Sequence, residues 1–275
     1  MTFSIAALVL FAALLHASWN ALLKGGRDGF WAMTVMGIAT SLTCAALVPF
    51  LPMPERASWP YIVGSALLHV GYNVFLIRAY RGGDFGSTYP IARGSSPLLV
   101  ALGAALLVGE WPALWGMVGI VLVSAGIISL TFRGRRLPEA GIFYALGTGL
   151  FIAAYSVTDG IGGRLSGSPV AYTVWMCLAW GGAALPIYLL RRGGGTLWRG
   201  PRNTGLAAAG GIISLLAYGI IIFAMTRAPM GSVSALRETS VLFAILLGWL
   251  FFGETLTARR ILSALVIAAG ALCLE

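Results

Sequence analysis

The sequence predicts an all-α integral membrane protein with ten transmembrane helices, arranged as two inverted five-helix repeats around a central cavity. Three observations lead to this fold class. Of the 275 residues, 59% are hydrophobic and only 10% are charged, whereas a soluble domain carries about 25% charged residues. Apolar runs long enough to cross a bilayer follow one another along the chain. One stretch of the first half also recurs in the second half.

The apolar runs divide the chain into ten expected spans with short linkers between them. Turns rich in glycine, proline or arginine separate the runs, as at Lys24, Pro52, Arg81, Arg133 and Arg191. The runs are too long and too continuously apolar for barrel strands, so helices are expected to cross the lipid. The spans are predicted at 3–23, 30–51, 58–80, 86–108, 112–131, 140–160, 168–190, 204–227, 231–252 and 256–274.

The duplication relates segment 86–110 to segment 231–254. Both open with Gly-Ser, carry an arginine about two helical turns in, and close with Gly-Glu after an apolar run. Arg93 aligns with Arg237, and Glu110 aligns with Glu254. We therefore expect a first repeat at 1–133, a linker at 134–139 and a second repeat at 140–275. Five helices per repeat is an odd number, which inverts the second repeat in the membrane, as in many secondary transporters.

The net charge of +9 is spread between the apolar runs. This distribution argues against a nucleic-acid partner, which needs a basic patch on one face. The loops that follow spans 1, 3, 5, 7 and 9 hold most of the Lys and Arg residues. The positive-inside rule places these loops in the cytoplasm, and both termini are then predicted outside.

With these features the chain resembles the drug/metabolite transporter superfamily, of the EamA-type ten-helix class, and is most similar to bacterial exporters of aromatic amino acids. The resemblance rests on the five-plus-five duplication, on the two Gly-Ser…Arg…Ser…Gly-Glu segments, and on the phrase Leu15-His-Ala-Ser-Trp-Asn20 in the first span. It implies a basket of helices with helices 5 and 10 at the periphery, in a bacterial inner membrane. It also implies a small-molecule substrate, no cofactor and no metal; a monomer is expected.

The first and third spans each carry one polar face. Residues three and four positions apart share a helix face, and a histidine inside a span is costly unless it meets a cavity or a partner. We expect these faces to bind substrate. The alternative is that they hydrogen-bond to neighbouring helices and hold the bundle together. The residues are His16, Trp19 and Asn20 in the first span, and His69, Tyr72 and Asn73 in the third.

Arg93, Arg237 and Glu238 are charged residues that lie inside spans. A guanidinium group forks well onto a carboxylate, so the arginines are candidates to bind a substrate carboxylate. The alternative is structural: Arg237 pairs with a carboxylate or loop carbonyls, and Arg93 extends to the interface. Adjacent helical residues point about 100° apart, so Glu238 is expected to pair with Arg93 and not with Arg237. Asp159 is expected at the interface.

Aromatic residues within the spans are candidates for the wall of an apolar or aromatic pocket, and core packing is the alternative for each of them. The candidates are Tyr89, Tyr155, Trp175 and Tyr218. The three cysteines fall within apolar runs without a paired spacing, which argues against a metal site.

Together these features predict a secondary transporter that exports small metabolites by alternating access, most of all amino acids with aromatic or other apolar side chains. Export of other metabolites or drugs, or flipping of a lipid-linked substrate, is the alternative. An enzyme is not expected, because the sequence contains no metal cluster, nucleophile elbow or phosphate loop. The first span also lacks the carboxylate on which small multidrug pumps rely.

Overall fold

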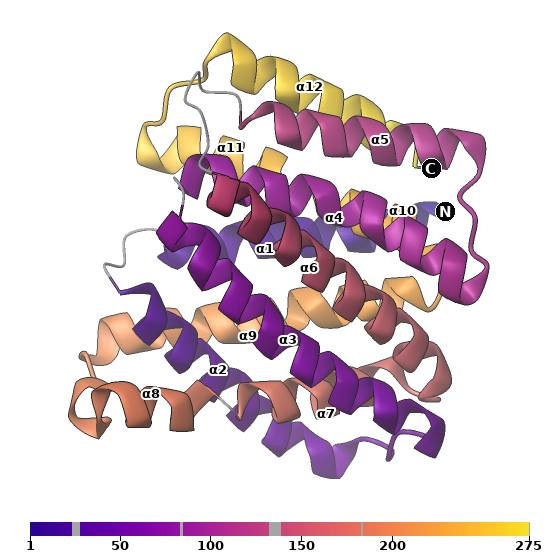
Figure 1. The fold of residues 1–275 in the computed structure, drawn as a ribbon. Coiled ribbons are helices and arrows are strands. Elements are labelled where there is room, and N and C mark those ends of the chain that lie inside the picture. Colours follow the sequence, from indigo (N-terminus) through magenta and orange to yellow (C-terminus); the bar gives the residue numbers. More distant parts are fainter. Residues whose placement is uncertain (24–27, 83–84, 132–138, 183, 275) are drawn as a thin grey trace.

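The computed structural model describes residues 1–23, 28–82, 85–131, 139–182 and 184–274 (Figure 1). These residues form helices and short connections, and none of them is in a β-strand. The all-α class predicted from the sequence is therefore confirmed. Within this part of the chain, seven helical runs are long and apolar enough to cross a membrane, and one shorter apolar helix accompanies them. The number of ten spans stays a prediction.

The first half of the chain contains five α-helices and two 3₁₀ turns. They are α1 (Phe3–Leu23), α2 (Gly29–Leu47), η1 (Val48–Phe50), η2 (Arg56–Ser58), α3 (Trp59–Gly82), α4 (Phe85–Val108) and α5 (Leu114–Ser129). The second half contains α6 (Glu139–Leu165), α7 (Pro169–Gly181), α8 (Ala184–Arg192), η3 (Gly194–Thr196), α9 (Pro201–Met225), α10 (Met230–Arg237), α11 (Ser240–Phe252) and α12 (Ala258–Leu272). Most of the expected linker between the halves, 134–139, lies outside the described residues.

One predicted span is interrupted within the described residues. The span expected at 231–252 consists of α10 and α11, whereas the span expected at 168–190 contains α7 and α8, which flank residue 183 outside the described part of the chain. Between α10 and α11 the backbone tightens into i→i+3 bonds, from Thr239 N to Leu236 O (3.1 Å) and from Val241 N to Glu238 O (3.1 Å). Such a tightened turn inside a helix redirects the side chains around it.

The sixth span is longer than predicted, because α6 continues through Gly160, Gly162 and Gly163 to Leu165. The span was predicted to end at residue 160. In the structure these glycines allow neighbouring helices to approach closely: a Cβ on Gly160 would meet Met230, one on Gly162 would meet the Tyr172 ring, and one on Gly163 would meet Ile222. Small residues serve this purpose in membrane helices.

The helices pack in pairs that connect the two halves of the chain (Figure 1). Helix α3 packs on α6, and α9 packs on α1; α2 packs on α9, and α7 packs on α3. Helices α5 and α12 lie side by side at one edge of the bundle, and both termini lie at the same end. Between this edge and the rest of the bundle, α4 packs against α10.

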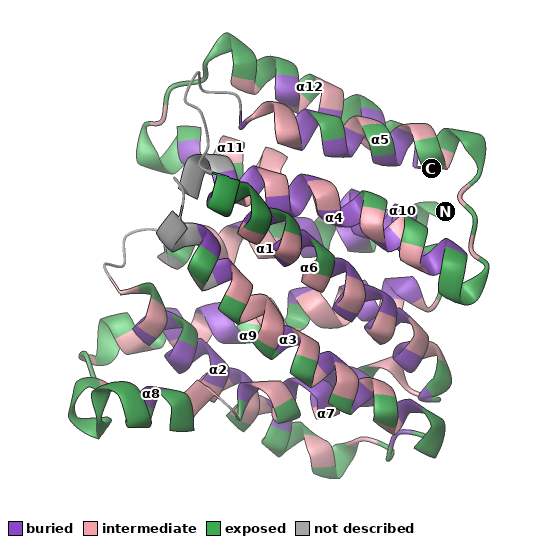
Figure 2. Cartoon of the chain, viewed as in Figure 1, coloured by how far each residue is buried: buried purple, intermediate pink, exposed green. Residues whose placement is uncertain are grey.

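The outer faces of the helices are exposed and apolar (Figure 2). Leu42 is 67% exposed and Leu190 is 88% exposed, and Leu67, Leu106 and Phe143 are exposed as well. Large apolar side chains on this scale are not stable against water. They fit a surface that faces lipid.

Both copies of the Gly-Glu sequence end a helix in the same way. Gly109 and Gly253 adopt positive φ angles of 72° and 64°. The amide of Glu110 then bonds to Ala104 O (3.2 Å), and the amide of Glu254 bonds to Gly248 O (3.1 Å). This backbone bond beyond the last turn is the helix stop that glycine favours. The shared sequence therefore encodes a shared helix end.

Candidate functional site

A cavity of about 170 Å³ lies at the centre of the bundle. Its walls come from α1 to α4, and from α6, α7, α9 and α10, whereas α5 and α12 do not reach it. Among the residues proposed from the sequence, the structure places the following around the cavity: His16, Trp19, His69, Tyr72, Asn73, Arg93, Tyr155, Tyr218 and Arg237. Their part in substrate binding stays a prediction.

Four proposed residues do not line the cavity. The Asn20 amide donates to His16 O of its own helix (2.8 Å). Tyr89 lies beside Arg93, with 5.9 Å between its ring centroid and the guanidinium carbon. Glu238 is buried behind the wall, as described below. Trp175 packs against Trp59.

Trp175 packs edge-on against Trp59, with ring centroids 5.2 Å apart, and does not line the cavity. Trp180, on the same helix, lines the cavity instead. The two tryptophans are five positions apart, and five steps of 100° place them on different faces of α7. Trp175 therefore lies outside the wall of this cavity, and its part in substrate binding stays a prediction.

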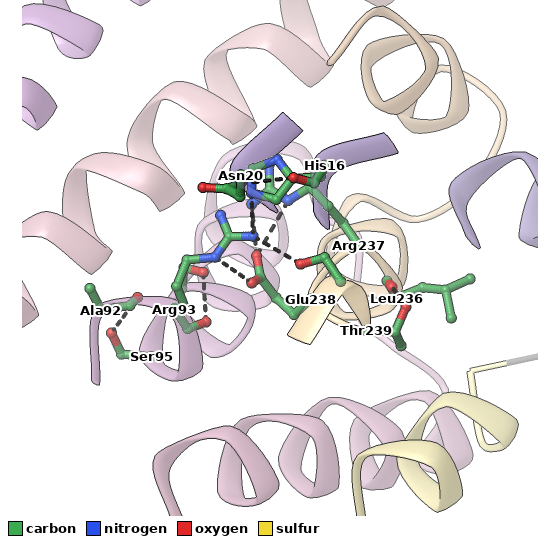
Figure 3. Close-up of polar contacts among 11 residues, drawn as sticks. His16, Asn20, Ala92, Arg93, Ser95, Leu236, Arg237, Glu238 and Thr239 are labelled. Carbon is green, nitrogen blue, oxygen red and sulfur yellow. Dashed lines mark hydrogen bonds and ion pairs between the residues drawn. The ribbon is translucent and has the colours of Figure 1, made fainter. Parts of the chain in front are cut away.

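Beside the cavity, Glu238 lies between two arginines (Figure 3). Glu238 Oε2 is 2.7 Å from Arg93 Nε, in an ion pair whose angle falls outside hydrogen-bond limits. Glu238 Oε1 accepts from Arg237 Nη2 (3.2 Å) and from Arg237 Nε (3.3 Å). The carboxylate is fully buried, and the two arginine side chains are almost so.

The predicted pairing of Arg93 with Glu238 is present, and the prediction that Arg237 would not pair with Glu238 is wrong. The prediction assumed a regular helix. The chain in fact turns at Glu238 between α10 and α11, and the long arginine side chain folds back onto its neighbour. One carboxylate therefore faces two guanidinium groups, which leaves a net positive charge in a region of low dielectric constant.

Arg93 also reaches His16 and Ser240. Arg93 Nη2 lies 3.4 Å from His16 Nε2 and 3.5 Å from Ser240 Oγ. A guanidinium group has no acceptor, so the histidine can take part only through a ring nitrogen that carries no proton. This contact therefore involves the neutral imidazole and adds no second charge.

The backbone of α4 adapts to proline next to Arg93. Pro97 has no amide hydrogen, which leaves the carbonyl of Arg93, four residues earlier, without its helical donor. Ser96 Oγ donates to that carbonyl instead (3.0 Å). The helix stays continuous, and the position of Arg93 on the cavity wall is preserved.

Aromatic rings form another part of the cavity wall. His69 stacks on Tyr155 with 4.1 Å between ring centroids, and Trp180 and Tyr218 lie 5.4 and 5.9 Å from His69. Tyr72 meets Tyr155 edge-on at 5.8 Å. The Nδ1 atom of His69 is 2.9 Å from Ser65 O, which orients the ring.

Two polar atoms of cavity residues are buried without a partner among the described residues. They are Trp19 Nε1, a donor, and Asn73 Oδ1, an acceptor. A buried polar group without a partner costs about 1–3 kcal/mol. Such a cost is explained when a ligand completes the hydrogen bonds.

The position of Asp159 differs from the prediction. Asp159 was expected at the interface, but its side chain is completely buried within α6. Tyr172 donates its hydroxyl hydrogen to Asp159 Oδ1 (2.9 Å), and Tyr218 donates to Asp159 Oδ2. The sequence did contain an indication that Asp159 faces the interior. Asp159 follows the cavity residue Tyr155 by four positions and so shares its face of the helix.

At the end of the bundle where α4 and α6 terminate, Glu110 joins three segments. Its Oε1 is 2.6 Å from Arg164 Nη1, and its Oε2 accepts from the amide of Met230 (3.1 Å). Arg164 also donates to Met225 O at 2.7 and 3.0 Å. This link connects the two halves of the chain at one side of the cavity. Glu110 is therefore more than a marker of a helix end.

No group of three His, Cys, Asp or Glu residues that could hold a metal ion occurs in the described part of the chain. The three cysteines are not in disulfides, and Cys44 and Cys177 are buried.

Comparison with known proteins supports a transporter fold. Residues 139–274 match the model of the EamA-like transporter family. A solved structure, described only as "Crystal structure of protein", matches 98% of this chain and 97% of its own, with 20% sequence identity and a TM-score of 0.80. This identity shows a common fold alone. No curated protein matches the sequence. Together with the apolar helices, the family match makes the chain a multi-pass membrane protein.

Proposed function

We propose that this membrane protein, whose second half matches the EamA-like transporter family, is a secondary transporter that exports small metabolites by alternating access. Its foremost substrates are amino acids with aromatic or other apolar side chains. It works without catalysing a reaction, as a monomer in a bacterial inner membrane.

The observation that carries the proposal is the ion group beside the cavity, which consists of Arg93, Arg237 and Glu238. Arg93 and Arg237 line the cavity, whereas Glu238 is behind them and cannot neutralise both. The cavity wall therefore offers a guanidinium group to a negatively charged ligand. A substrate carboxylate fits this position.

The rest of the cavity suits the other parts of an amino acid. Asn73 Oδ1 is an acceptor available for an ammonium group, and Trp19 Nε1 is an available donor for a carboxylate. The rings of His69, Tyr72 and Tyr155 offer an apolar and aromatic surface for a side chain. A zwitterion with an apolar side chain would satisfy all three features.

The packing is compatible with two inverted repeats that move against each other. The cavity reaches Met33, which is 45% exposed near the start of α2. At the other end the Glu110–Arg164 link and an apolar cluster around Val9, Val157 and Met225 close the bundle. With the loop charges of the sequence, the open end faces the cytoplasm and both termini are outside.

The test uses purified protein in liposomes. Labelled phenylalanine should exchange across the membrane in the presence of unlabelled phenylalanine, and phenylalaninamide should compete at least about tenfold less well, because it lacks the carboxylate. Arg237→Ala should remove most of this preference, since Glu238 keeps Arg93 as a partner and the fold survives. The matched control is Arg259→Ala, whose guanidinium group bonds to Ser129 O away from the cavity.

Equal loss of phenylalanine and phenylalaninamide in Arg237→Ala would contradict carboxylate binding. If no amino acid in a panel of aromatic, branched and polar types exchanges, the substrate is instead another metabolite, a drug or a lipid-linked molecule.

A further inference from the structure

Asp159 is a buried carboxylate that the ion group around Glu238 does not use. Its side chain has no exposed surface, and its hydrogen-bond donors are the hydroxyl groups of Ser65, Tyr172 and Tyr218, which come from α3, α7 and α9. Among the described residues, no Lys, Arg or His nitrogen forms an ion pair with it. A carboxylate inside a membrane span without a cationic partner marks an ion or proton pathway by default.

The hydroxyl partners allow both protonation states of this carboxylate. A tyrosine hydroxyl donates to an ionised carboxylate and can rotate to accept from a protonated one. A guanidinium group is a donor only, so the arginines around Glu238 satisfy the ionised state alone. Asp159 can therefore gain and lose a proton without leaving a buried group unpaired, whereas Glu238 cannot.

The surroundings of Asp159 connect it to the cavity. The titratable groups that face it from the packed helices are His69, Tyr155, Tyr172, Cys177 and Tyr218. None of these is a carboxylate. The charge of Arg237 acts on Tyr155 and Tyr218, and Arg237 is already paired with Glu238. Tyr218 and His69 line the cavity, and Tyr218 bonds Asp159 directly. The Tyr218 hydroxyl thus bridges the carboxylate and the substrate space.

We propose that Asp159 is the proton-carrying residue of the transporter and couples export of the substrate to import of protons. This inference rests on the proposed function. With the cavity open to the outside, the carboxylate takes one proton from water through the Tyr218 hydroxyl and becomes a neutral acid. With the cavity open to the cytoplasm, its O–H bond breaks and the proton leaves to water there. Each cycle moves one proton inward, and no other bond changes.

The first experiment needs no substrate. Infrared difference spectra of the purified protein are recorded between about pH 6 and pH 9, a range in which an unperturbed carboxyl group is almost fully ionised. The wild type should show a carboxylic acid C=O band that disappears as the pH rises. Asp159→Asn should lack this band, and Glu110→Gln, the matched control at the end of the bundle, should keep it. An unchanged band in Asp159→Asn would overturn the proposal.

A second variant covers the case in which Asp159→Asn does not fold. Tyr218→Phe keeps the ring and removes one hydroxyl from the carboxylate, so the C=O band should shift in frequency. A band at the wild-type position in Tyr218→Phe would equally overturn the assignment to Asp159.

The second experiment measures coupling in liposomes that contain a trapped pH indicator. A phenylalanine gradient should drive a proton flux in the wild type. Asp159→Asn should retain exchange of labelled phenylalanine but lose the proton flux. Tyr172→Phe should retain both and move the pH midpoint of exchange upward, because removing a donor disfavours the ionised carboxylate.

A proton flux that persists in Asp159→Asn would contradict the proposal while leaving transport itself intact. Absence of any phenylalanine exchange in the wild type would count against the proposed function, and the infrared measurement would still decide the question of Asp159.

Discussion

Two carboxylates are buried equally deeply in this protein but have opposite surroundings. Glu238 lies between Arg93 and Arg237, which come from α4 and α10. Asp159 lies between the hydroxyl groups of Tyr172 and Tyr218, which come from α7 and α9. Both carboxylates have no exposed surface.

The difference shows that burial alone does not determine what an acid does in a membrane protein. Desolvation opposes the charge of both groups. Two cations offset that cost at Glu238 and bind the acid into a structural ion group. At Asp159 the hydroxyl groups and the nearby His69 ring take the place of those two cations, so a change of protonation is open to that group. The partners, and not the depth, separate the two roles.

The largest effect is expected from Glu238→Gln. The substitution keeps the shape of the side chain but leaves two buried arginines without a counter-charge. Breaking a buried ion pair in this way costs about 3–5 kcal/mol. The check is thermal unfolding of the purified protein in detergent. A midpoint close to that of the wild type would show that water or lipid headgroups reach the arginines and that the ion group is not structural.

Asp159→Ala should have the next largest effect. It leaves the hydroxyl groups of Tyr172 and Tyr218 buried without an acceptor, at about 1–3 kcal/mol each. Asp159→Asn retains an acceptor and should lose clearly less stability. The same unfolding assay compares the two variants. Equal losses would mean that the charge of Asp159, and not its hydrogen bonds, holds α6, α7 and α9 together.

Gly162→Ala should disturb the packing around Asp159 and leave the ion group around Glu238 unchanged. A methyl group at this position would collide with the ring of Tyr172, and overpacking of this kind costs about 1–3 kcal/mol. Gly205→Ala is the matched control, since nothing lies within 4 Å of the added atom and α9 is helical there. If Gly162→Ala unfolds at the wild-type temperature, α6 and α7 are less closely packed than the structure shows.

The smallest effect concerns a third acid, Asp28, outside the spans. Burial acts to raise the pKa of Asp28, but hydrogen bonds from the Trp31 amide, Arg199 and Arg192 outweigh it and hold the pKa below its usual value. The stabilisation is therefore fully present above the unfolded pKa of about 3.9 and is lost as the pH falls through the lower folded pKa.

Asp28→Asn isolates the charge of this acid, because asparagine caps a helix about as well as aspartate. At pH 7 the variant should lose less than about 1 kcal/mol. The difference in the free energy of unfolding between the wild type and Asp28→Asn should shrink as the pH falls below about 4. Unfolding curves at a series of pH values measure this difference. A difference that grows at low pH would contradict the lowered pKa of Asp28.

Local periodicity accounts for the parts of the site that the sequence predicted. On a helix the direction of a side chain follows from its position alone, so the faces that carry His16 and Trp19, and His69 and Tyr72, could be assigned to the cavity. The helix ends at Gly109 and Gly253 were similarly predictable, because glycine tolerates the left-handed conformation that stops a helix.

The remaining features depend on contacts between distant segments. The hydroxyl donors to Asp159 come from Tyr172 and Tyr218, 13 and 59 residues away along the chain, and no local pattern fixes such a meeting. The turn at Glu238 likewise lies where α10 packs against α4. Trp175 and Trp180 are both tryptophans in the same apolar run. Only the orientation of α7 in the bundle determines which of them lines the cavity.

Arg93 is synthesised well before Glu238, the carboxylate that it shares with Arg237. Glu238 leaves the ribosome roughly 145 residues after Arg93, which at about 5–20 residues per second is a delay of about 7–30 s. During that time α4 carries a guanidinium group without the counter-charge of Glu238, at a cost of about 2.5–3.5 kcal/mol at the centre of a span. The Arg93 guanidinium group of the newly made first half therefore gains this counter-charge only when the second half supplies Glu238.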